Sequence, residues 1–171
     1  MTVSRAPQVL IRPGREDDLV ELNELYNYYV RETPITFDIA PITMEQRLAW
    51  FGHYDVAGRH RLLVAVVDDR VLGYASSSPF RPKAAYETSV EASIYLASDA
   101  TGLGIGTALY SRLFEELASE DVRHALGGIA LPNPASIALH ARFGFTLVGT
   151  YSEQGRKFDR YWDLAWYEKG L

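Results

Sequence analysis

The chain has 171 residues, a formal net charge of -5 and no cysteine. This length fits one domain with a substantial core, and we expect a single domain over residues 1–171. The acidic balance argues against a nucleic-acid partner, which would need a basic face. The lack of cysteine excludes disulfides, thiol nucleophiles and sulfur-ligated metals. Residues 1–8 lack the apolar run of a signal peptide, and no stretch approaches the length of a membrane span. We therefore expect a protein that spans no membrane and works in the cytoplasm.

The first third of the chain predicts one strand and two helices. A short apolar run at 9–11 is closed by Pro13-Gly14 and reads as a strand. Acidic residues at 16–18 then open a helix whose apolar positions run at helical spacing to Val30, and Thr33-Pro34 ends it. A second helix begins after Thr43, a candidate N-cap, and runs to about Phe51.

The rest of the chain predicts a mixed sheet interrupted by two helices. The expected strands are 62–67, 71–77, 90–96, 125–131, 146–151 and 161–167. In 90–96 the residues Val90, Ala92, Ile94 and Leu96 share one face, and Glu91, Ser93 and Tyr95 share the other. One helix follows the glycine-rich segment at 102–106. The other is opened by Asn133 with Pro134 in its first turn and is stopped by Gly144. The fold class is therefore α/β, or mixed α+β, in one layered unit.

The segment Gly102-Leu103-Gly104-Ile105-Gly106 lies between a predicted strand and a predicted helix. Glycines allow positive φ angles, and successive amides at a helix N-terminus can then face a phosphate. The alternative interpretation is a flexible turn. A dinucleotide fingerprint fails, because its third glycine would fall at Thr107 or Leu109, and no GxxxxGK[ST] occurs. We therefore favour a phosphate-bearing ligand of another kind.

Several blocks in order along the chain carry a family resemblance. Thr101-x-x-Gly104-x-Gly106 resembles the Gln/Arg-x-x-Gly-x-Gly/Ala loop of the GNAT superfamily of N-acetyltransferases. The run 133–145 is similar to that superfamily's second motif. Nearly the whole chain resembles the branch of phosphinothricin and methionine-sulfoximine acetyltransferases, through the blocks 11–13, 26–30, 36–38, 86–95, 129–133 and 157–163. Thr101 departs from the loop motif, and we expect it to weaken the grip on the cofactor.

The resemblance implies a GNAT-like domain with a largely antiparallel sheet of about seven strands and about four helices. It implies acetyl-CoA as cofactor, a small amino-acid-like amine as acceptor, direct attack of its α-amine on the thioester, and a homodimer. The implied general base is Glu91, and His140 would protonate the leaving thiolate. The implied cofactor-binding residues are Ile94, Tyr95, Leu96, Gly102, Leu103, Gly104, Ile105, Gly106, Thr107, Asn133 and Ser136. The implied acceptor-binding residues are Phe37, Lys83, Tyr86, Tyr110 and Ala130.

Several of these residues could instead have purely structural roles. Glu91 could be a carboxylate on a half-exposed strand, His140 a packing residue, Lys83 a surface lysine and Tyr110 a core aromatic. The remaining histidines show no ligand spacing, so we expect no metal. The acceptor could instead be a polyamine or a protein N-terminus, or the chain could be a CoA-binding module without turnover.

Overall fold

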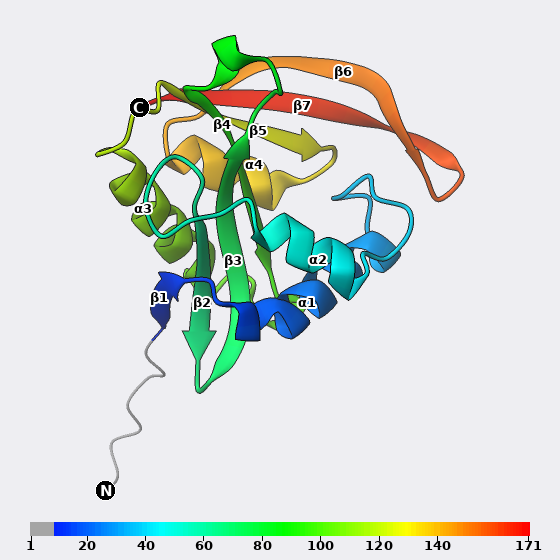
Figure 1. The fold of residues 1–171 in the computed structure, drawn as a ribbon. Helices are drawn as coiled ribbons and strands as arrows, with labels where there is room; N and C mark the ends of the chain where they lie inside the picture. The colour runs from blue at the N-terminus through cyan, green and yellow to red at the C-terminus, as the bar shows by residue number, and fades with distance from the viewer. Residues whose placement is uncertain (1–8) are drawn as a thin grey trace, which may run out of the picture.

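The computed structural model describes residues 9–171, so the predicted absence of a signal peptide at residues 1–8 lies outside the described part. The chain forms one mixed seven-stranded sheet with the order β1-β2-β3-β4-β5-β7-β6 (Figure 1). The strands are β1 (Leu10–Pro13), β2 (Leu62–Val67), β3 (Arg70–Pro79), β4 (Ser89–Leu96), β5 (His124–Ala130), β6 (Thr146–Lys157) and β7 (Arg160–Gly170). The helices are α1 (Leu19–Glu32), α2 (Met44–Phe51), α3 (Ile105–Leu117) and α4 (Pro134–Arg142), with short 3-10 turns at Glu16–Asp18, Ala84–Tyr86 and Ser98–Ala100. The predicted element order and fold class are confirmed.

The pairing of β4 with β5 is parallel, whereas every other ladder of the sheet is antiparallel. The parallel ladder is short, since it joins Ser89 to His124, Val90 to Ala125 and Glu91 to Leu126. Beyond Glu91 the two strands continue without pairing to each other, and β4 runs on to Leu96. This separation opens the sheet near its middle, and the candidate site lies around it.

Helices cover both faces of the sheet. On one face Leu63 and Ala65 of β2 pack in a cluster with Leu109 and Leu113 of α3. On the other face Leu62, Val64 and Val66 pack with Leu19 and Leu22 of α1, and Trp50 of α2 lies against that cluster. Because β2 is covered on both sides, its residues read as a continuous apolar run rather than an alternating one.

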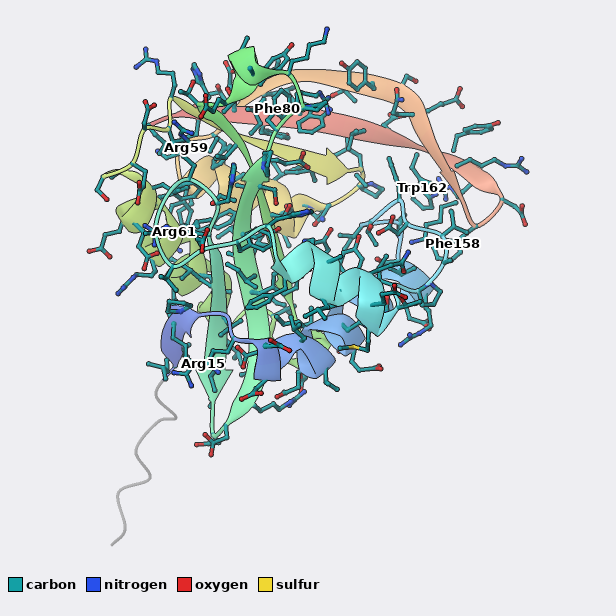
Figure 2. All side chains as sticks on the ribbon, in the orientation of Figure 1. Arg15, Arg59, Arg61, Phe80, Phe158 and Trp162 are labelled. Carbon is teal, nitrogen blue, oxygen red and sulfur yellow. The ribbon has the colours of Figure 1, made fainter. Side chains whose placement is uncertain are left out.

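Buried ion pairs add to the contact between α3 and the sheet. Arg61, labelled in Figure 2, lies one residue before β2 and is 8% exposed. It contacts Glu116 at 3.2 Å and Glu120 at 2.7 Å. At the start of the chain, Arg12 of β1 pairs with Asp18 at 2.7 Å. This pair fixes the Glu16–Asp18 turn, which is a 3-10 turn ahead of α1, although the sequence predicted one continuous helix that begins at residues 16–18.

The predicted helix signals are confirmed in detail. The Thr43 hydroxyl accepts a hydrogen bond from the Gln46 amide, and the Gln46 side chain accepts one from the Thr43 amide, which is a capping box. The Asn133 side chain accepts from the Ser136 amide at 3.1 Å, and Gly144 ends α4 at a φ of 83°. No helix within residues 9–171 is long and apolar enough to cross a membrane.

The last two strands are longer than predicted, because β6 runs to Lys157 and β7 begins at Arg160. Polar residues at 152–154 hid this extension, since they break the alternation on which the prediction depended. The structure absorbs them as an irregularity in the ladder between Tyr151 and Gly155. There Glu153 has a φ of 52°, and its amide donates to the Asp163 carboxylate at 2.8 Å.

Candidate active site

Two cavities meet where β4 and β5 separate. One, of about 430 Å³, lies on the side of α2, and we call it the α2 cavity. The other, of about 510 Å³, lies against the start of α3 and against α4, and we call it the α3 cavity. Five residues line both: Ile35, Ser93, Tyr95, Gly128 and Ala130. A molecule in one cavity can therefore contact a molecule in the other through the gap between the strands.

The glycine-rich segment forms one wall of the α3 cavity. Gly102 and Gly104 have φ angles of 76° and 79°, and a side chain at either position would meet no atom within 4 Å. Glycine is therefore needed here for the left-handed backbone rather than for space. Gly104 is the N-cap of α3, and the first intrahelical bond runs from the Ala108 amide to the Gly104 carbonyl at 3.0 Å. The amides at 105–107 have no partner within the helix and can bind an anion.

Most of the predicted cofactor residues line the α3 cavity. These are Ile94, Tyr95, Leu96, Gly102, Gly104, Gly106, Thr107, Asn133 and Ser136. The side chains of Leu103 and Ile105 do not line it, because Leu103 is 67% exposed and Ile105 lies in the core. One wall of the α3 cavity has free backbone amides, and its other walls have apolar side chains. This lining fits a ligand in which a phosphate group is joined to a narrow, extended chain. Thr101 borders the cavity, and its hydroxyl donates to the Ser98 carbonyl at 3.3 Å.

His140 and Tyr110 lie together beside the α3 cavity. His140 is 3% exposed, and its Nδ1 lies 2.8 Å from the Ser136 carbonyl oxygen. A carbonyl only accepts, so Nδ1 carries the proton and Nε2 accepts from the Tyr110 hydroxyl at 3.1 Å. Burial lowers the pKa of His140, although the bond to Ser136 opposes this. Gly127 of β5 makes the arrangement possible, since a side chain there would collide with the imidazole.

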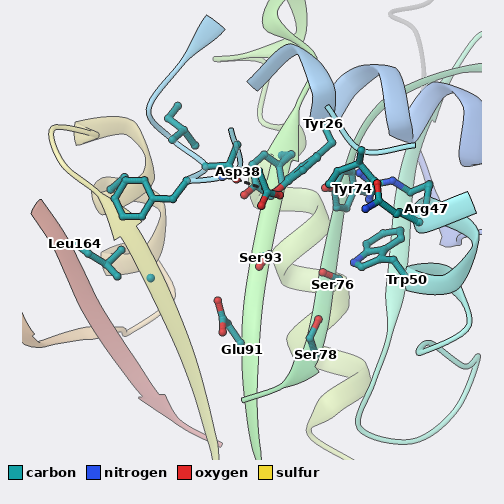
Figure 3. A pocket seen from close by; sticks show the side chains of 18 of the residues that line it. Tyr26, Asp38, Arg47, Trp50, Tyr74, Ser76, Ser78, Glu91, Ser93 and Leu164 are labelled. Atoms are coloured by element: carbon teal, nitrogen blue, oxygen red, sulfur yellow. Dashed lines mark hydrogen bonds between the residues drawn. The ribbon is translucent and has the colours of Figure 1, made fainter. Parts of the chain in front are cut away.

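Glu91 lies in the wall of the α2 cavity and is the last residue of β4 that pairs with β5 (Figure 3). Its side chain points to the same face of the sheet as Ser93 and Ser78, and Ser78 of β3 is its cross-strand neighbour. Burial raises the pKa of Glu91, and the positive charge of Arg81 partly opposes the rise. A half-buried carboxylate with a raised pKa is a stronger base than an exposed one. The Glu91 side chain also faces the α2 cavity directly.

A loop between α1 and α2 closes the α2 cavity. The Lys157 ammonium is buried and donates to the Thr36 carbonyl at 2.8 Å, while the Tyr26 hydroxyl donates to Asp38 at 2.6 Å. The ring of Phe37 lies so close to Gly155 of β6 that a side chain at that position would collide with it. Phe37, a predicted acceptor-binding residue, lines the α2 cavity, and its position depends on contacts that come from the far end of the chain.

The other predicted acceptor residues are distributed differently. Ala130 lines both cavities. Lys83 and Tyr86 line neither, because both lie exposed in the segment around the Ala84–Tyr86 turn, where the Tyr86 ring packs on Phe80. Tyr110 is wholly buried among core aromatics and borders the α3 cavity rather than the α2 cavity, which favours its alternative interpretation as a core residue.

Sequence reasoning missed several residues that line the α2 cavity: Arg47, Trp50, Tyr54, Ser76 and Ser78. A signal for two of them was present. Ser76-Ser77-Ser78 is a run of hydroxyls inside a strand that otherwise reads as buried, and buried hydroxyls need partners. Nothing local could indicate Arg47, because its burial results from the packing of α2 against α1.

A family model described as "Acetyltransferase (GNAT) family" matches residues 22–145. The chain belongs to this family. It is 57% identical over 166 residues to a phosphinothricin N-acetyltransferase from Streptomyces coelicolor, with 96% of this chain and 97% of the relative covered. It is 33% identical over 161 residues to an L-methionine sulfoximine/L-methionine sulfone acetyltransferase from Pseudomonas paraeruginosa, with 94% of each covered. A solved phosphinothricin acetyltransferase from Sinorhizobium meliloti, in complex with acetyl-CoA, superposes with a TM-score of 0.89 at 32% identity, covering 95% of this chain and 88% of that one.

The first prediction concerns the electrostatics of Glu91. Replacing Arg81 by Gln removes the positive charge that lowers the pKa of Glu91, so this pKa should rise further. An NMR titration of the Glu91 side-chain carboxyl carbon measures the change, and added salt should reduce the difference between wild type and variant. Arg112→Gln, on the exposed side of α3, is the control and should leave the titration unchanged. An unshifted Glu91 titration in Arg81→Gln would contradict this account.

Proposed function

We propose that this protein transfers an acetyl group from acetyl-CoA to the α-amine of a small amino-acid-like acceptor of the phosphinothricin or methionine sulfoximine type. The observation that carries the proposal is the meeting of the two cavities at the gap between β4 and β5. One cavity has the free amides that a pyrophosphate needs, and the other has a carboxylate that can take a proton from an amine. The names of the relatives support the same substrate class.

The residues of the α3 cavity fit acetyl-CoA, which brings an acetyl group already activated as a thioester. The amides from Gly102 to Thr107 would hold the pyrophosphate at the N-terminus of α3. Asn133 and Ser136 would contact the pantetheine arm near the start of α4. Ile94 and Leu96 of β4 give this arm an apolar surface beside the strand separation.

The proposed chemistry uses one residue in each cavity. Glu91 accepts a proton from the acceptor ammonium, so that the free amine can attack the thioester directly. His140 supplies the proton that the leaving thiolate takes up. Its lowered pKa means that a protonated imidazole here releases its proton readily. The Tyr110 hydroxyl, which lies 3.1 Å from Nε2 of His140, would hold the ring in place for this step, accepting from Nε2 when the imidazole is protonated.

The substrate class predicts the outcome of a panel of amines in a thiol-release assay. Phosphinothricin and methionine sulfoximine should be acetylated with a higher kcat/KM than spermidine or a peptide with a free N-terminus. Mass spectrometry of the products should place the acetyl group on the α-nitrogen. Preference for the polyamine or the peptide would contradict the proposed class, and CoA binding without any product would contradict the enzymatic role.

The role of Glu91 predicts a specific kinetic defect. Glu91→Gln keeps the size of the side chain and removes the base, so kcat/KM for the acceptor should fall by about 10²- to 10⁴-fold. The KM for acetyl-CoA should stay within about twofold of wild type, because the substitution lies in the other cavity. In wild type, kcat/KM should rise with pH through the raised pKa of Glu91, and this limb should vanish in the variant.

The matched control for this experiment is Glu115→Gln, an exposed residue of α3, which should keep wild-type rates and the wild-type pH profile. If Glu91→Gln retains near-normal turnover across pH, Glu91 is not the base.

We also propose that two copies of the chain associate through the β6–β7 hairpin. The hairpin lies at the edge of the sheet and exposes large apolar side chains: Leu147, Val148, Tyr151, Phe158 and Tyr161, each more than half exposed. Exposed apolar side chains along a long edge strand are typical of an interface, and a second copy provides a matching apolar surface.

The dimer proposal predicts a mass near twice 19.2 kDa in sedimentation equilibrium. Combining Val148→Lys with Tyr151→Glu should shift the chain to monomer mass, because both substitutions place charges in the proposed interface. Val20→Lys, on the exposed side of α1, should leave the mass unchanged. Monomer mass for the wild-type protein at all concentrations would contradict the proposal.

A further inference from the structure

Arg47 is a buried cation in the wall of the α2 cavity. It is 3% exposed and lies on α2. Its guanidinium carbon lies 4.5 Å from the centre of the Trp50 ring and 4.9 Å from that of Tyr26, and its Nε donates to the Asn23 side chain at 3.2 Å. These contacts hold the guanidinium in one orientation, because its two flat neighbours and one fixed hydrogen bond restrict its rotation.

Arg47 has no carboxylate partner in the described part of the chain, 9–171. Six other arginines there form ion pairs: Arg12, Arg59, Arg61, Arg70, Arg112 and Arg156. Among residues 9–171 the Nη atoms of Arg47 make no hydrogen bond to the chain. Every fully buried side-chain nitrogen in that range has a hydrogen-bond partner, so the Nη atoms are not fully buried. The Nη atoms must therefore reach the cavity. A buried charge of this kind is costly unless an anion or water meets it.

The cavity connects Arg47 to Glu91 through a row of polar and aromatic side chains. Ser78 is the cross-strand neighbour of Glu91, and its hydroxyl lies 2.8 Å from that of Tyr54. The Tyr54 ring contacts Trp50, which in turn contacts Arg47. Figure 3 shows Glu91 and Arg47 at separate places in the wall, with serines of β3 between them. A base and a cation are thus placed at two ends of one cavity.

We propose that Arg47 binds an anionic group of the acceptor, its α-carboxylate or an acidic group of its side chain, while the amine lies toward Glu91. This inference rests on the proposed function and names the residue that selects acidic acceptors. The planar guanidinium offers two parallel N–H groups, which match carboxylate and phosphinate oxygens. Lys83, the predicted anion partner, is exposed and lines neither cavity, so Arg47 takes this role.

The test compares acceptors that carry a given anionic group with analogues that lack it, in wild type and Arg47→Met. Phosphinothricin is the acidic acceptor, and its α-carboxamide lacks the carboxylate. If Arg47 binds the α-carboxylate, the ratio of kcat/KM between them should fall by about 10- to 100-fold in Arg47→Met, as expected for the loss of a charge-assisted pair. The KM for acetyl-CoA should not change. Arg31→Met, an exposed residue of α1 that lines neither cavity, is the matched control and should keep the wild-type ratio.

A further acceptor distinguishes the two sources of the anion. Methionine sulfone has an α-carboxylate and a neutral side chain. If Arg47 binds the α-carboxylate, methionine sulfone should depend on Arg47 as strongly as phosphinothricin does. If Arg47 binds the phosphinate, methionine sulfone should be nearly insensitive to Arg47→Met, and the carboxamide of phosphinothricin should remain sensitive.

A binding measurement separates failure of this inference from failure of the proposed function. Phosphinothricin should raise the Tm of the wild-type protein and not that of Arg47→Met, whether or not turnover occurs. An equal loss of kcat/KM for phosphinothricin, its carboxamide and methionine sulfone, or an equal Tm shift in both proteins, would mean that Arg47 is only structural. Should Arg47→Met fail to fold, Arg47→Lys keeps the charge beside the aromatic rings and loses the paired N–H groups. In Arg47→Lys the kcat/KM of phosphinothricin relative to its carboxamide or to methionine sulfone should fall by a smaller factor, and no change in either ratio would overturn the proposal.

Discussion

The separation of β4 from β5 after Glu91 is the feature on which the rest of the site depends. Each strand is held along its length by its other neighbour, β4 by β3 and β5 by β7. The separation therefore does not unfold either strand. It leaves the facing backbone groups of residues 92–96 and 127–130 without sheet partners. Buried backbone groups require hydrogen bonds, so this gap is suited to a ligand with amide groups of its own.

The alternation of side chains along β4 lets one strand serve both cavities. Glu91 and Ser93 face the side of α2, and Ala92 and Ile94 face the side of α3. In the proposed mechanism the base in the α2 cavity and the thioester in the α3 cavity are thus separated by the thickness of one strand. The gap beside the strand is the place where an amine from one side can reach an acyl carbon on the other.

Local signals were sufficient to predict the elements, the helix caps and the two faces of β4, because each depends on residues close in sequence. The α2 cavity was beyond such reasoning. Arg47 becomes a cavity residue only because α2 packs against α1 and over β3. Phe37 is positioned by Gly155, and the loop before it by Lys157, both more than 100 residues away. Lys83 was predicted by resemblance alone, and resemblance does not fix the direction of a loop.

The net charge of the whole chain and the charges inside the α2 cavity favour different acceptors. A net charge of -5 slightly favours a cationic acceptor, but exposed charges are screened within about 8–10 Å in physiological salt. Inside the α2 cavity the nearest charges determine which acceptor binds, since the surroundings are less polar than water and charges interact more strongly there. Arg47 and Glu91 present opposite charges to one cavity of about 430 Å³. A zwitterion can match both, whereas a polyamine would bring a second cation toward the guanidinium. The local pair therefore favours an amino acid over the amine that the overall charge suggests.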